Sequence, residues 1–344
     1  MIKQVELAPG YSVCRLINGG WQLSEGHIEG GYDRQAALED LRELVETGLT
    51  SFDCADIYVG VEELLGDLSR ALSSGEELQI HTKFVPDKSR LGSLSRHDVE
   101  RSIDRSLHRL AVDRLDLVQF HWWDYEVPGY LEAAGWLAEQ QAAGKIHHLG
   151  TTNVDTAHLR ELVEADIPVV SNQVQYSLLD RRSESQMVRL CRESGIHLLC
   201  YGTVAGGFLS SHWVGMPDPL SAAGNRSLTK YRLIIEEFGG WVLFQELLAA
   251  LSKIARRHKV SLTNVATRWV LDRAQVAAAI VGARSATHLQ DNLRVFALHL
   301  DSEDETVLDE VLTRSSGPTG EPFDLERVPG GRHSSIMKTD LNRQ

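Results

Sequence analysis

Apolar runs of strand length alternate with helical patterns along most of this chain. Eight such runs occur in the 344-residue sequence, at 14–18, 50–53, 78–83, 115–121, 146–151, 169–174, 197–201 and 278–281. Helical patterns lie between them at 34–46, 62–73, 98–110, 129–143, 156–164 and 183–193. Eight strands that alternate with helices are what a (β/α)₈ barrel requires. We therefore expect an α/β fold in which residues 1–314 form one barrel.

Two segments interrupt this alternation. Residues 206–240 follow the seventh run, are rich in Gly, Ser and Pro, and are unusually long for a connection. We expect them to form a loop that projects over the mouth of the barrel. Residues 315–344 contain Gly-Pro-Thr-Gly-Glu-Pro and Pro-Gly-Gly-Arg, which predict an irregular tail. This tail either folds across the mouth or frays at the chain end.

The composition disfavours several classes of partner and compartment. A formal charge of −13 and a pI near 5.5 argue against nucleic acid, whose binding needs Lys and Arg to neutralise phosphates. No apolar run approaches the roughly 20 residues that span a bilayer, and the first residues lack the apolar core of a signal peptide. The cysteines show no CxxC spacing, so free thiols in a cytoplasmic protein are expected. The oligomeric state is not indicated.

Four chemically complementary side chains stand at or just after the ends of predicted strands. Asp53, Lys83 and His121 end the second, third and fourth runs, and Tyr58 follows Asp53 by five positions. The carboxyl ends of parallel barrel strands meet at one mouth. A phenol has a pKa of about 10, so a nearby ammonium is needed to bring its acidity toward neutral pH. Together the four residues predict a proton-donating site, whereas each one alone also fits a structural ion pair.

Other polar and aromatic residues allow more than one interpretation. His147 and His148 raise the question of a metal, but neighbouring strand residues point to opposite sides and no third ligand has suitable spacing. No metal site is therefore predicted. Four tryptophans are candidates for the lining of a substrate pocket, with a core position as the alternative. They are Trp21, Trp122, Trp123 and Trp213.

Six short motifs, in order along the chain, resemble the aldo-keto reductase superfamily. They are Phe-Asp-Cys-Ala at 52–55 followed by Tyr58, His-Thr-Lys at 81–83, Asp-Leu-Val at 116–118 leading to His121 and Asp124, Gly-Thr-Thr-Asn at 150–153, Asn-Gln-Val-Gln-Tyr at 172–176, and Val-Gly-Ala-Arg-Ser at 281–285 running into Asp291 and Asn292. The resemblance covers roughly residues 12 to 312. It implies a barrel oxidoreductase that moves a hydride between a nicotinamide cofactor and an aldehyde, a ketone or the corresponding alcohol.

The resemblance also implies a role for each strand-end residue. The nicotinamide delivers a hydride to the carbonyl carbon while Tyr58 protonates the oxygen. Lys83, fixed by Asp53, lowers the pKa of Tyr58, and His121 orients and polarises the carbonyl. Tyr58 and His121 would then form a donor pair that stabilises negative charge in the transition state.

A cofactor site of the Rossmann type is not expected, because no Gly-x-Gly-x-x-Gly motif follows a strand. The resemblance instead implies an extended cofactor across the mouth, with its carboxamide held by Thr152, Asn153 and Gln173 and its ring stacked on Tyr201. The full set expected to bind the cofactor is Gly20, Trp21, Asp53, Thr152, Asn153, Gln173, Tyr201, Gly202, Thr203, Val204, Gly207, Leu209, Gly282, Arg284, Ser285, His288, Asp291 and Asn292.

The adenine end of the cofactor is expected at residues 282–292. Ser285 suits the cap of a helix whose N-terminus attracts a phosphate. Arg284 offers a fork for the 2′-phosphate of NADP, so NADP is preferred over NAD. Relatives usually carry Glu at the position of Asp291 and Arg or Gln at that of His288, so NAD is the alternative.

The sequence therefore predicts an NADP(H)-dependent carbonyl reductase or alcohol dehydrogenase that acts on a small molecule. One alternative is an NAD-dependent sugar or polyol dehydrogenase on the same fold. The other is a regulatory subunit that binds NADP with little turnover, against which the intact set of four strand-end residues argues. The physiological substrate is not identified by any motif.

Overall fold

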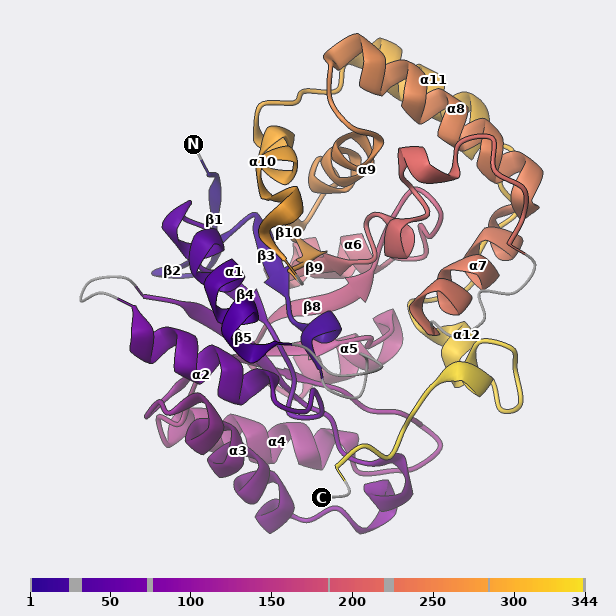
Figure 1. Cartoon of the computed structure of the whole chain (residues 1–344). Coiled ribbons are helices and arrows are strands. Elements are labelled where there is room, and N and C mark those ends of the chain that lie inside the picture. Colours follow the sequence, from indigo (N-terminus) through magenta and orange to yellow (C-terminus); the bar gives the residue numbers. More distant parts are fainter. Residues whose placement is uncertain are drawn as a thin grey trace.

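Eight parallel strands form a closed barrel in the computed structural model, which describes residues 2–24, 33–72, 77–184, 186–219, 226–283 and 285–342 (Figure 1). In order around the barrel they are β3 (Leu16–Gly19), β4 (Ser51–Asp53), β5 (Gln79–Phe84), β6 (Leu115–Phe120), β7 (Ile146–Thr152), β8 (Val169–Gln175), β9 (His197–Tyr201) and β10 (Val276–Gly282). The last strand pairs in parallel with the first and completes the ring. Each predicted run overlaps one barrel strand, so the expected (β/α)₈ fold is confirmed.

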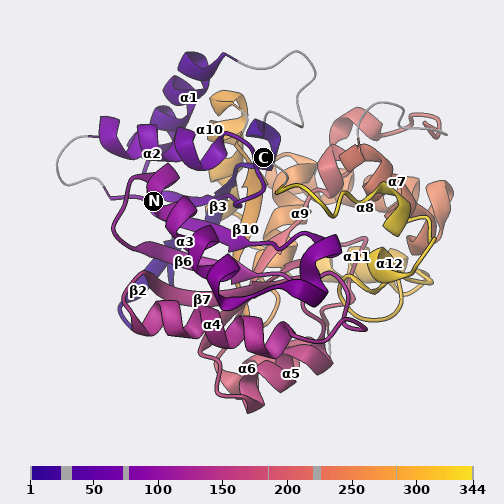
Figure 2. The ribbon, with the colours of Figure 1, turned by 90° about the horizontal axis from the view of Figure 1, so that it is seen from below.

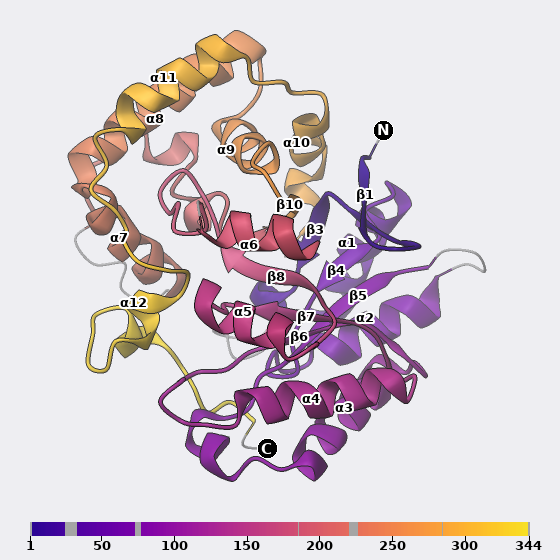
Figure 3. The same cartoon turned by 180° about the vertical axis from the view of Figure 1, so that it is seen from behind.

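Helices form an outer layer around the strands, as the views from below and from behind show (Figure 2 and Figure 3). They are α1 (Arg34–Glu46), α2 (Val61–Ala71), α3 (Arg96–Leu110), α4 (Tyr130–Ala142), α5 (Thr156–Glu164), α6 (Gln186–Ser194), α7 (Arg226–Phe238), α8 (Gly240–His258), α9 (Leu262–Leu271), α10 (Leu289–Asn292), α11 (Ser302–Leu312) and α12 (Asp324–Arg327). The six predicted helical patterns correspond to α1 through α6. Among the described helices, none is both long enough and apolar enough to cross a membrane.

The segment 206–240 differs from the loop that its composition predicts, because most of its second half is the helix α7. Tyr231, Ile234, Ile235 and Phe238 are buried along this helix at the spacing of one helical face. Tyr231 approaches the backbone so closely that a Cβ on Gly206 would lie 2.6 Å from its ring. The flanking Gly, Ser and Pro residues hide this apolar stripe in the sequence.

The amino-terminal end of the barrel is covered by the antiparallel pair β1 (Gln4–Ala8) and β2 (Tyr11–Cys14). Tyr11 packs with inward-facing residues such as Leu117 and Leu199, and its hydroxyl lies 3.1 Å from Nε2 of His81 on β5. This pair of strands was not predicted, and only Cys14 of it falls within the predicted run at 14–18.

The run at 14–18 is broken at Arg15, so it contributes to two different sheets. The Arg15 guanidinium donates hydrogen bonds to the backbone carbonyls of Leu271, Val276 and Ala277. These bonds tie the start of β3 to the end of α9 and to β10.

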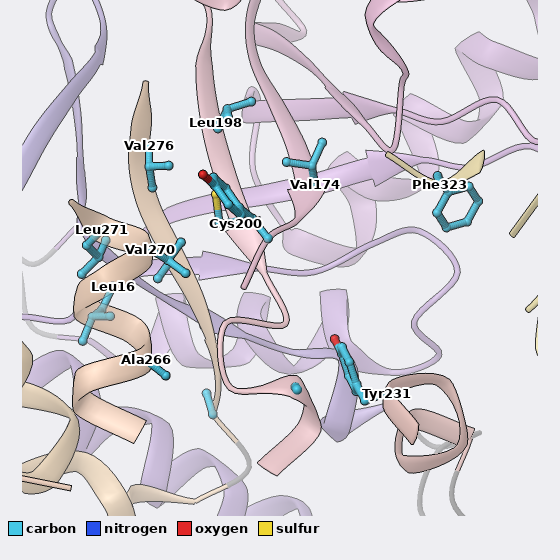
Figure 4. Packing of buried hydrophobic residues seen from close by; sticks show 14 of the residues in the cluster. Leu16, Val174, Leu198, Cys200, Tyr231, Ala266, Val270, Leu271, Val276 and Phe323 are labelled. Carbon is cyan, nitrogen blue, oxygen red and sulfur yellow. The ribbon is translucent and has the colours of Figure 1, made fainter. Parts of the chain in front are cut away.

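The main core lies between the strands and the outer helices. Figure 4 shows Leu16, Cys200 and Val276 of the strands beside Ala266 and Val270 of α9. All four cysteines are buried and free, as the absence of a spacing motif indicates; they are Cys14, Cys54, Cys191 and Cys200.

The buried His81 makes the stability of the fold depend on pH. Burial is the main cause that lowers the pKa of His81 to about 4, from 6.5 in an unfolded chain. Between these two pH values the unfolded state binds more protons than the folded state. The folded state therefore keeps its full stability above pH 6.5 and loses stability as the pH falls toward 4.

We predict that His81→Phe makes the free energy of unfolding less dependent on pH below pH 6.5. The slope should fall by up to about 1.4 kcal/mol per pH unit, because one titrating group has been removed. Urea unfolding at a series of pH values measures the slope, with the exposed His97→Phe as the control. An unchanged slope in the His81 variant would contradict the prediction.

Candidate active site

A cavity of about 840 Å³ lies at the carboxyl ends of the barrel strands. Asp53, Tyr58, Lys83 and His121 all line it, so the fold brings the four strand-end residues together. They belong to β4, the loop after β4, β5 and the residue that follows β6. They meet because neighbouring parallel strands end on the same side of a barrel.

Lys83 and Asp53 form a buried ion pair at the base of this cavity. The Lys83 ammonium lies 2.7 Å from Oδ2 of Asp53 and 2.7 Å from the carbonyl oxygen of Cys54. The amide groups of Gln119 and Gln173 donate to Oδ1 of Asp53 at 2.9 and 2.6 Å. Burial is the largest single influence and lowers the pKa of Lys83, but Asp53, Tyr58 and Cys54 together raise this pKa by more. Lys83 is therefore charged at neutral pH.

Tyr58 lies against both Lys83 and Trp21. The Lys83 ammonium is 5.1 Å from the centroid of the Tyr58 ring, and the Trp21 ring packs edge-on at 4.9 Å. Burial is the largest influence on the pKa of Tyr58 and raises it, while Lys83 lowers it. Lys83 thus acts in the expected direction, but the net pKa of Tyr58 lies above its ordinary value because desolvation of the phenolate is the larger effect.

His121 is held by one backbone carbonyl and two aromatic rings. Its Nδ1 lies 3.0 Å from the carbonyl oxygen of Thr152, and the rings of Trp123 and Phe323 pack edge-on at 4.4 and 5.4 Å. A carbonyl oxygen only accepts hydrogen bonds, so Nδ1 carries the hydrogen and the neutral ring keeps a lone pair on Nε2. Burial, followed by the charge of Arg327, lowers the pKa of His121 to about 3.

The role expected of His121, to orient and polarise the carbonyl, stays a prediction. Its Nε2 is buried and has no hydrogen-bond partner among the described residues.

Most of the residues expected to bind the cofactor line the same cavity. They are Trp21, Asp53, Thr152, Asn153, Gln173, Tyr201, Gly202, Thr203, Val204, Gly207, Gly282, His288, Asp291 and Asn292. Tyr201 donates from its hydroxyl to Oδ1 of Asn153 at 2.8 Å, and this bond holds its ring beside the end of β7. At the other end, Asp291 accepts a 2.6 Å hydrogen bond from Ser261.

Four members of the expected set are placed differently. Gly20 is not part of the cavity lining and donates from its backbone to the carbonyl of Asp53, whereas Leu209 is wholly buried in the core. Ser285 precedes only a short 3₁₀ turn, and its hydroxyl donates to Thr287 instead of capping the backbone. Arg284 lies outside the described residues.

Only two of the four candidate tryptophans line the cavity. Trp21 and Trp123 do so, but Trp122 points into the core, where its indole donates to the carbonyls of Asp124 and Val127. Trp213 packs against Phe208 and away from the cavity, with ring centroids 4.7 Å apart.

The carboxyl-terminal tail crosses the mouth, which was one of its two expected arrangements. Phe323, Met337 and Lys338 contribute to the cavity lining. The tail is fixed beyond them by a hydrogen bond from the backbone of Lys88 to the carbonyl of Thr339. In Figure 3 this yellow segment runs from α12 toward the end of the chain near α3 and α4.

Several residues of the site escaped the sequence reasoning. Gln119, near the end of β6, does not line the cavity but supports it by donating to Asp53, and the alternation of a strand was a signal that its side chain faces inward. Ser261 at the start of α9, Lys230 on α7 and Phe323 of the tail carry no comparable signal.

The pair His147 and His148 does not behave as the strand pattern predicts. Their ring centroids lie 4.0 Å apart, so the two rings pack against each other instead of pointing to opposite sides. Both rings also pack on Tyr11 at the amino-terminal end of the barrel. Within the ranges that the structure describes, no group of three or more His, Cys, Asp or Glu side chains is placed to hold a metal ion.

Comparisons with known proteins agree with this fold. The model of the aldo/keto reductase family matches residues 15–313. Aldo-keto reductase YhdN of Bacillus subtilis (strain 168) is 28% identical over 325 residues, which cover 91% of this chain and 95% of the relative. The NADH-specific methylglyoxal reductase of Escherichia coli (strain K12) is 23% identical over 320 residues, covering 87% and 95%.

Two further similarities concern a yeast protein and a solved structure. The NADP(+) aldo-keto reductase yakc of Schizosaccharomyces pombe is 27% identical over 309 residues, which cover 87% of each chain. The thermostable aldo-keto reductase Tm1743, solved with the inhibitor epalrestat, matches with a TM-score of 0.71 at 25% identity and covers 90% of this chain and 100% of its own. Since the family match spans the barrel and its mouth, this chain belongs to the aldo/keto reductase family of oxidoreductases.

Proposed function

We propose that this protein interconverts an aldehyde or ketone and the corresponding alcohol with NADP(H), and that Tyr58 is the proton donor. The observation that carries the proposal is the position of Tyr58 beside Lys83, with 5.1 Å between ring centroid and ammonium, on the wall of one cavity. Asp53 keeps the Lys83 ammonium in place at 2.7 Å. A fixed cation beside a phenol stabilises the phenolate that remains after proton donation.

The lining of the cavity fits a nicotinamide. The side chains of Thr152, Asn153 and Gln173 combine hydroxyl and amide groups, which together offer donors and acceptors to a carboxamide. Tyr201 supplies an aromatic face that its bond to Asn153 holds in place. A bound nicotinamide supplies or takes up the hydride, and the protein's residues bind and orient the reactants.

The proton movement follows from the local electrostatics. In the direction of reduction, the Tyr58 hydroxyl donates its proton to the substrate oxygen, and the negative charge left on Tyr58 is stabilised by Lys83. Burial raises the pKa of Tyr58, which keeps the hydroxyl protonated before the reaction. His121 lines the same cavity, where it would orient and polarise the substrate carbonyl.

For the cofactor we propose NADP, on the sequence position of Arg284. The second candidate, an NAD-dependent sugar or polyol dehydrogenase, is favoured by Asp291, because a carboxylate suits a ribose 2′-hydroxyl and repels a 2′-phosphate. Ser261 donates a hydrogen bond to one oxygen of this carboxylate. The relatives include one named for NADH and one named for NADP(+). A regulatory subunit would bind NADPH yet barely oxidise it, which a fluorescence titration followed by turnover on an aldehyde panel distinguishes.

The assignment of Tyr58 is tested by Tyr58→Phe. The variant removes one hydroxyl and retains the ring, so turnover should fall by at least ~10²-fold while NADPH affinity changes little. Reduction of 4-nitrobenzaldehyde and NADPH fluorescence measure the two quantities. Tyr130→Phe, on the surface of α4, is the control. Near-normal turnover in the Tyr58 variant would show that Tyr58 is not the proton donor.

The coupling of Lys83 to Tyr58 is tested by Lys83→Met. Lys83 lowers the pKa of Tyr58, so its removal should raise that pKa further and move the alkaline limb of alcohol oxidation to higher pH. The pH profile of oxidation measures this shift. If activity is retained with an unshifted profile, Lys83 does not set the acidity of Tyr58.

The cofactor preference is tested by Arg284→Ala. A hydrogen bond to a charged group contributes on the order of 1.5–3 kcal/mol, or roughly 10- to 150-fold in affinity. NADPH binding should weaken by about that factor, whereas NADH, which lacks the 2′-phosphate, should be unaffected. If the unmodified protein already binds NADH as tightly as NADPH, the result favours the NAD-dependent sugar or polyol dehydrogenase.

A further inference from the structure

The end of the carboxyl-terminal tail is bound to the residues that follow β5. The carbonyl of Thr339 accepts a 2.9 Å hydrogen bond from the backbone of Lys88, and the carboxylate of Asp340 accepts one of 3.0 Å from the backbone of Ser89. Residues 336–342 are therefore called the docked segment. Four of its side chains line the active-site cavity; they are Ile336, Met337, Lys338 and Leu341. The docked segment is thus part of the cavity wall.

Asn342 makes the contacts that hold the far end of the docked segment. Its side-chain amide donates to the carbonyl of Val85 at 2.7 Å, and its side-chain oxygen accepts from Nη2 of Arg105 at 3.0 Å. Its backbone donates to Oδ1 of Asp87 at 2.9 Å. An amide side chain suits this position, because it offers a donor and an acceptor at the same time.

Arg105 of α3 joins Asn342 to the loop that carries Tyr58. The same Nη2 atom lies 3.7 Å from Oδ2 of Asp56, which is buried two positions before Tyr58. Asp56 also accepts a 3.3 Å hydrogen bond from the backbone N–H of Val85. The Val85 backbone is therefore bonded to Asp56 through its N–H and to Asn342 through its carbonyl. The tail and the Tyr58 loop meet at this residue, which itself lines the cavity.

The groups around Asp56 give Arg105 a specific electrostatic effect. Burial, followed by the Glu62 carboxylate of α2, raises the pKa of Asp56 to about 7, whereas Arg105 lowers it. Arg109, one turn further along α3, pairs with Glu62 and donates to the backbone carbonyl of Asp56 at 3.0 Å. Arg105 is therefore the cation that favours the charged form of the Asp56 side chain, while its partly exposed guanidinium also reaches the tail.

We propose that Arg105 is a positioning residue, which couples the docked segment to the Tyr58 loop through Asn342 and Asp56 and so holds the cavity wall that the tail supplies. Arg105 does not itself line the cavity, so it acts through these two residues. The kinetic part of this inference rests on the proposed function; the docking of the tail does not.

The position of the docked segment decides which step it affects. The ion pair of Lys83 and Asp53 keeps its own partners whether or not the tail is docked, so proton transfer should continue. Residues 85–89 follow β5, which β3 and β4 separate from β10 and from the expected adenine site at 282–292. Loss of the docked segment should therefore weaken binding of the carbonyl substrate and leave binding of NADPH unchanged.

The docking of the tail is tested by amide hydrogen exchange in residues 336–342, which needs no activity. Asn342→Ala, a change at the chain end that does not threaten the fold, and Arg105→Met should each accelerate exchange by about 2- to 12-fold, the effect of one lost hydrogen bond. Groups in one network are not additive, so the double variant should exchange little faster than the faster single variant. Arg101→Met, which removes an exposed partner of Asp98 on the same helix, is the control.

The cavity wall is tested by the reduction of 4-nitrobenzaldehyde. In Asn342→Ala and in Arg105→Met, the KM for the aldehyde should rise by about 2- to 12-fold, because the same docking equilibrium is weakened. The values of kcat and of the NADPH affinity should change little. Arg105→Lys retains a cation beside Asp56 and should restore most of the exchange protection and of the KM.

The results separate coupling from a merely structural role. Unchanged exchange in both single variants, or a double variant in which the two accelerations multiply, would overturn the coupling. A fall in kcat or in NADPH affinity as large as the rise in KM would overturn the role in the cavity wall. If the unmodified protein does not reduce the aldehyde, the proposed function is in doubt, but the exchange data still decide whether Arg105 holds the tail.

Discussion

The buried ion pair between Lys83 and Asp53 is the interaction on which the rest of the active site depends. Removing two charges from water costs several kcal/mol per ion, so such a pair persists only when its remaining donors and acceptors are satisfied. Here the Cys54 carbonyl accepts a hydrogen bond from Lys83, while the side chains of Gln119 and Gln173 donate hydrogen bonds to the Asp53 carboxylate. These partners come from different strands, so only a closed barrel assembles them. The same contacts fix the Lys83 ammonium beside the Tyr58 ring.

The mouth of the barrel is shaped by segments that lie outside the eight strands. Glu326 of the tail is buried 3.5 Å from Lys230 of α7 and 3.6 Å from Arg182. Burial would raise the pKa of Glu326, but these two cations lower it, so the carboxylate stays ionised. The tail is thereby joined to α7 on one side and to the strand ends, through Arg327, on the other. Substrate preference in this protein is consequently expected to depend on the tail as much as on the barrel.

The strands and the strand-end residues were predictable because they follow from local patterns. Short apolar runs identify strands whatever their partners are, and a polar residue at the end of such a run must lie at the mouth of a parallel barrel. The failures have equally definite causes. The helix α7 was missed because its apolar stripe is flanked by Gly, Ser and Pro, and Trp122 was misplaced because its direction depends on the backbone after β6. The packing of His147 against His148 likewise depends on Tyr11, which arrives from a distant part of the chain.

The sequence by itself determined the order of the strands, the family of the chain and the presence of Asp53, Tyr58, Lys83 and His121 at one mouth. Only the tertiary structure decided how those groups behave. Burial outweighs Lys83 at Tyr58, and the Thr152 carbonyl selects which nitrogen of His121 carries its hydrogen. Arg327 of the tail donates a hydrogen bond to the carbonyl of Asn153, which is 174 positions away in the sequence. Desolvation and hydrogen-bond direction arise from such distant contacts, and no local pattern of residues encodes them.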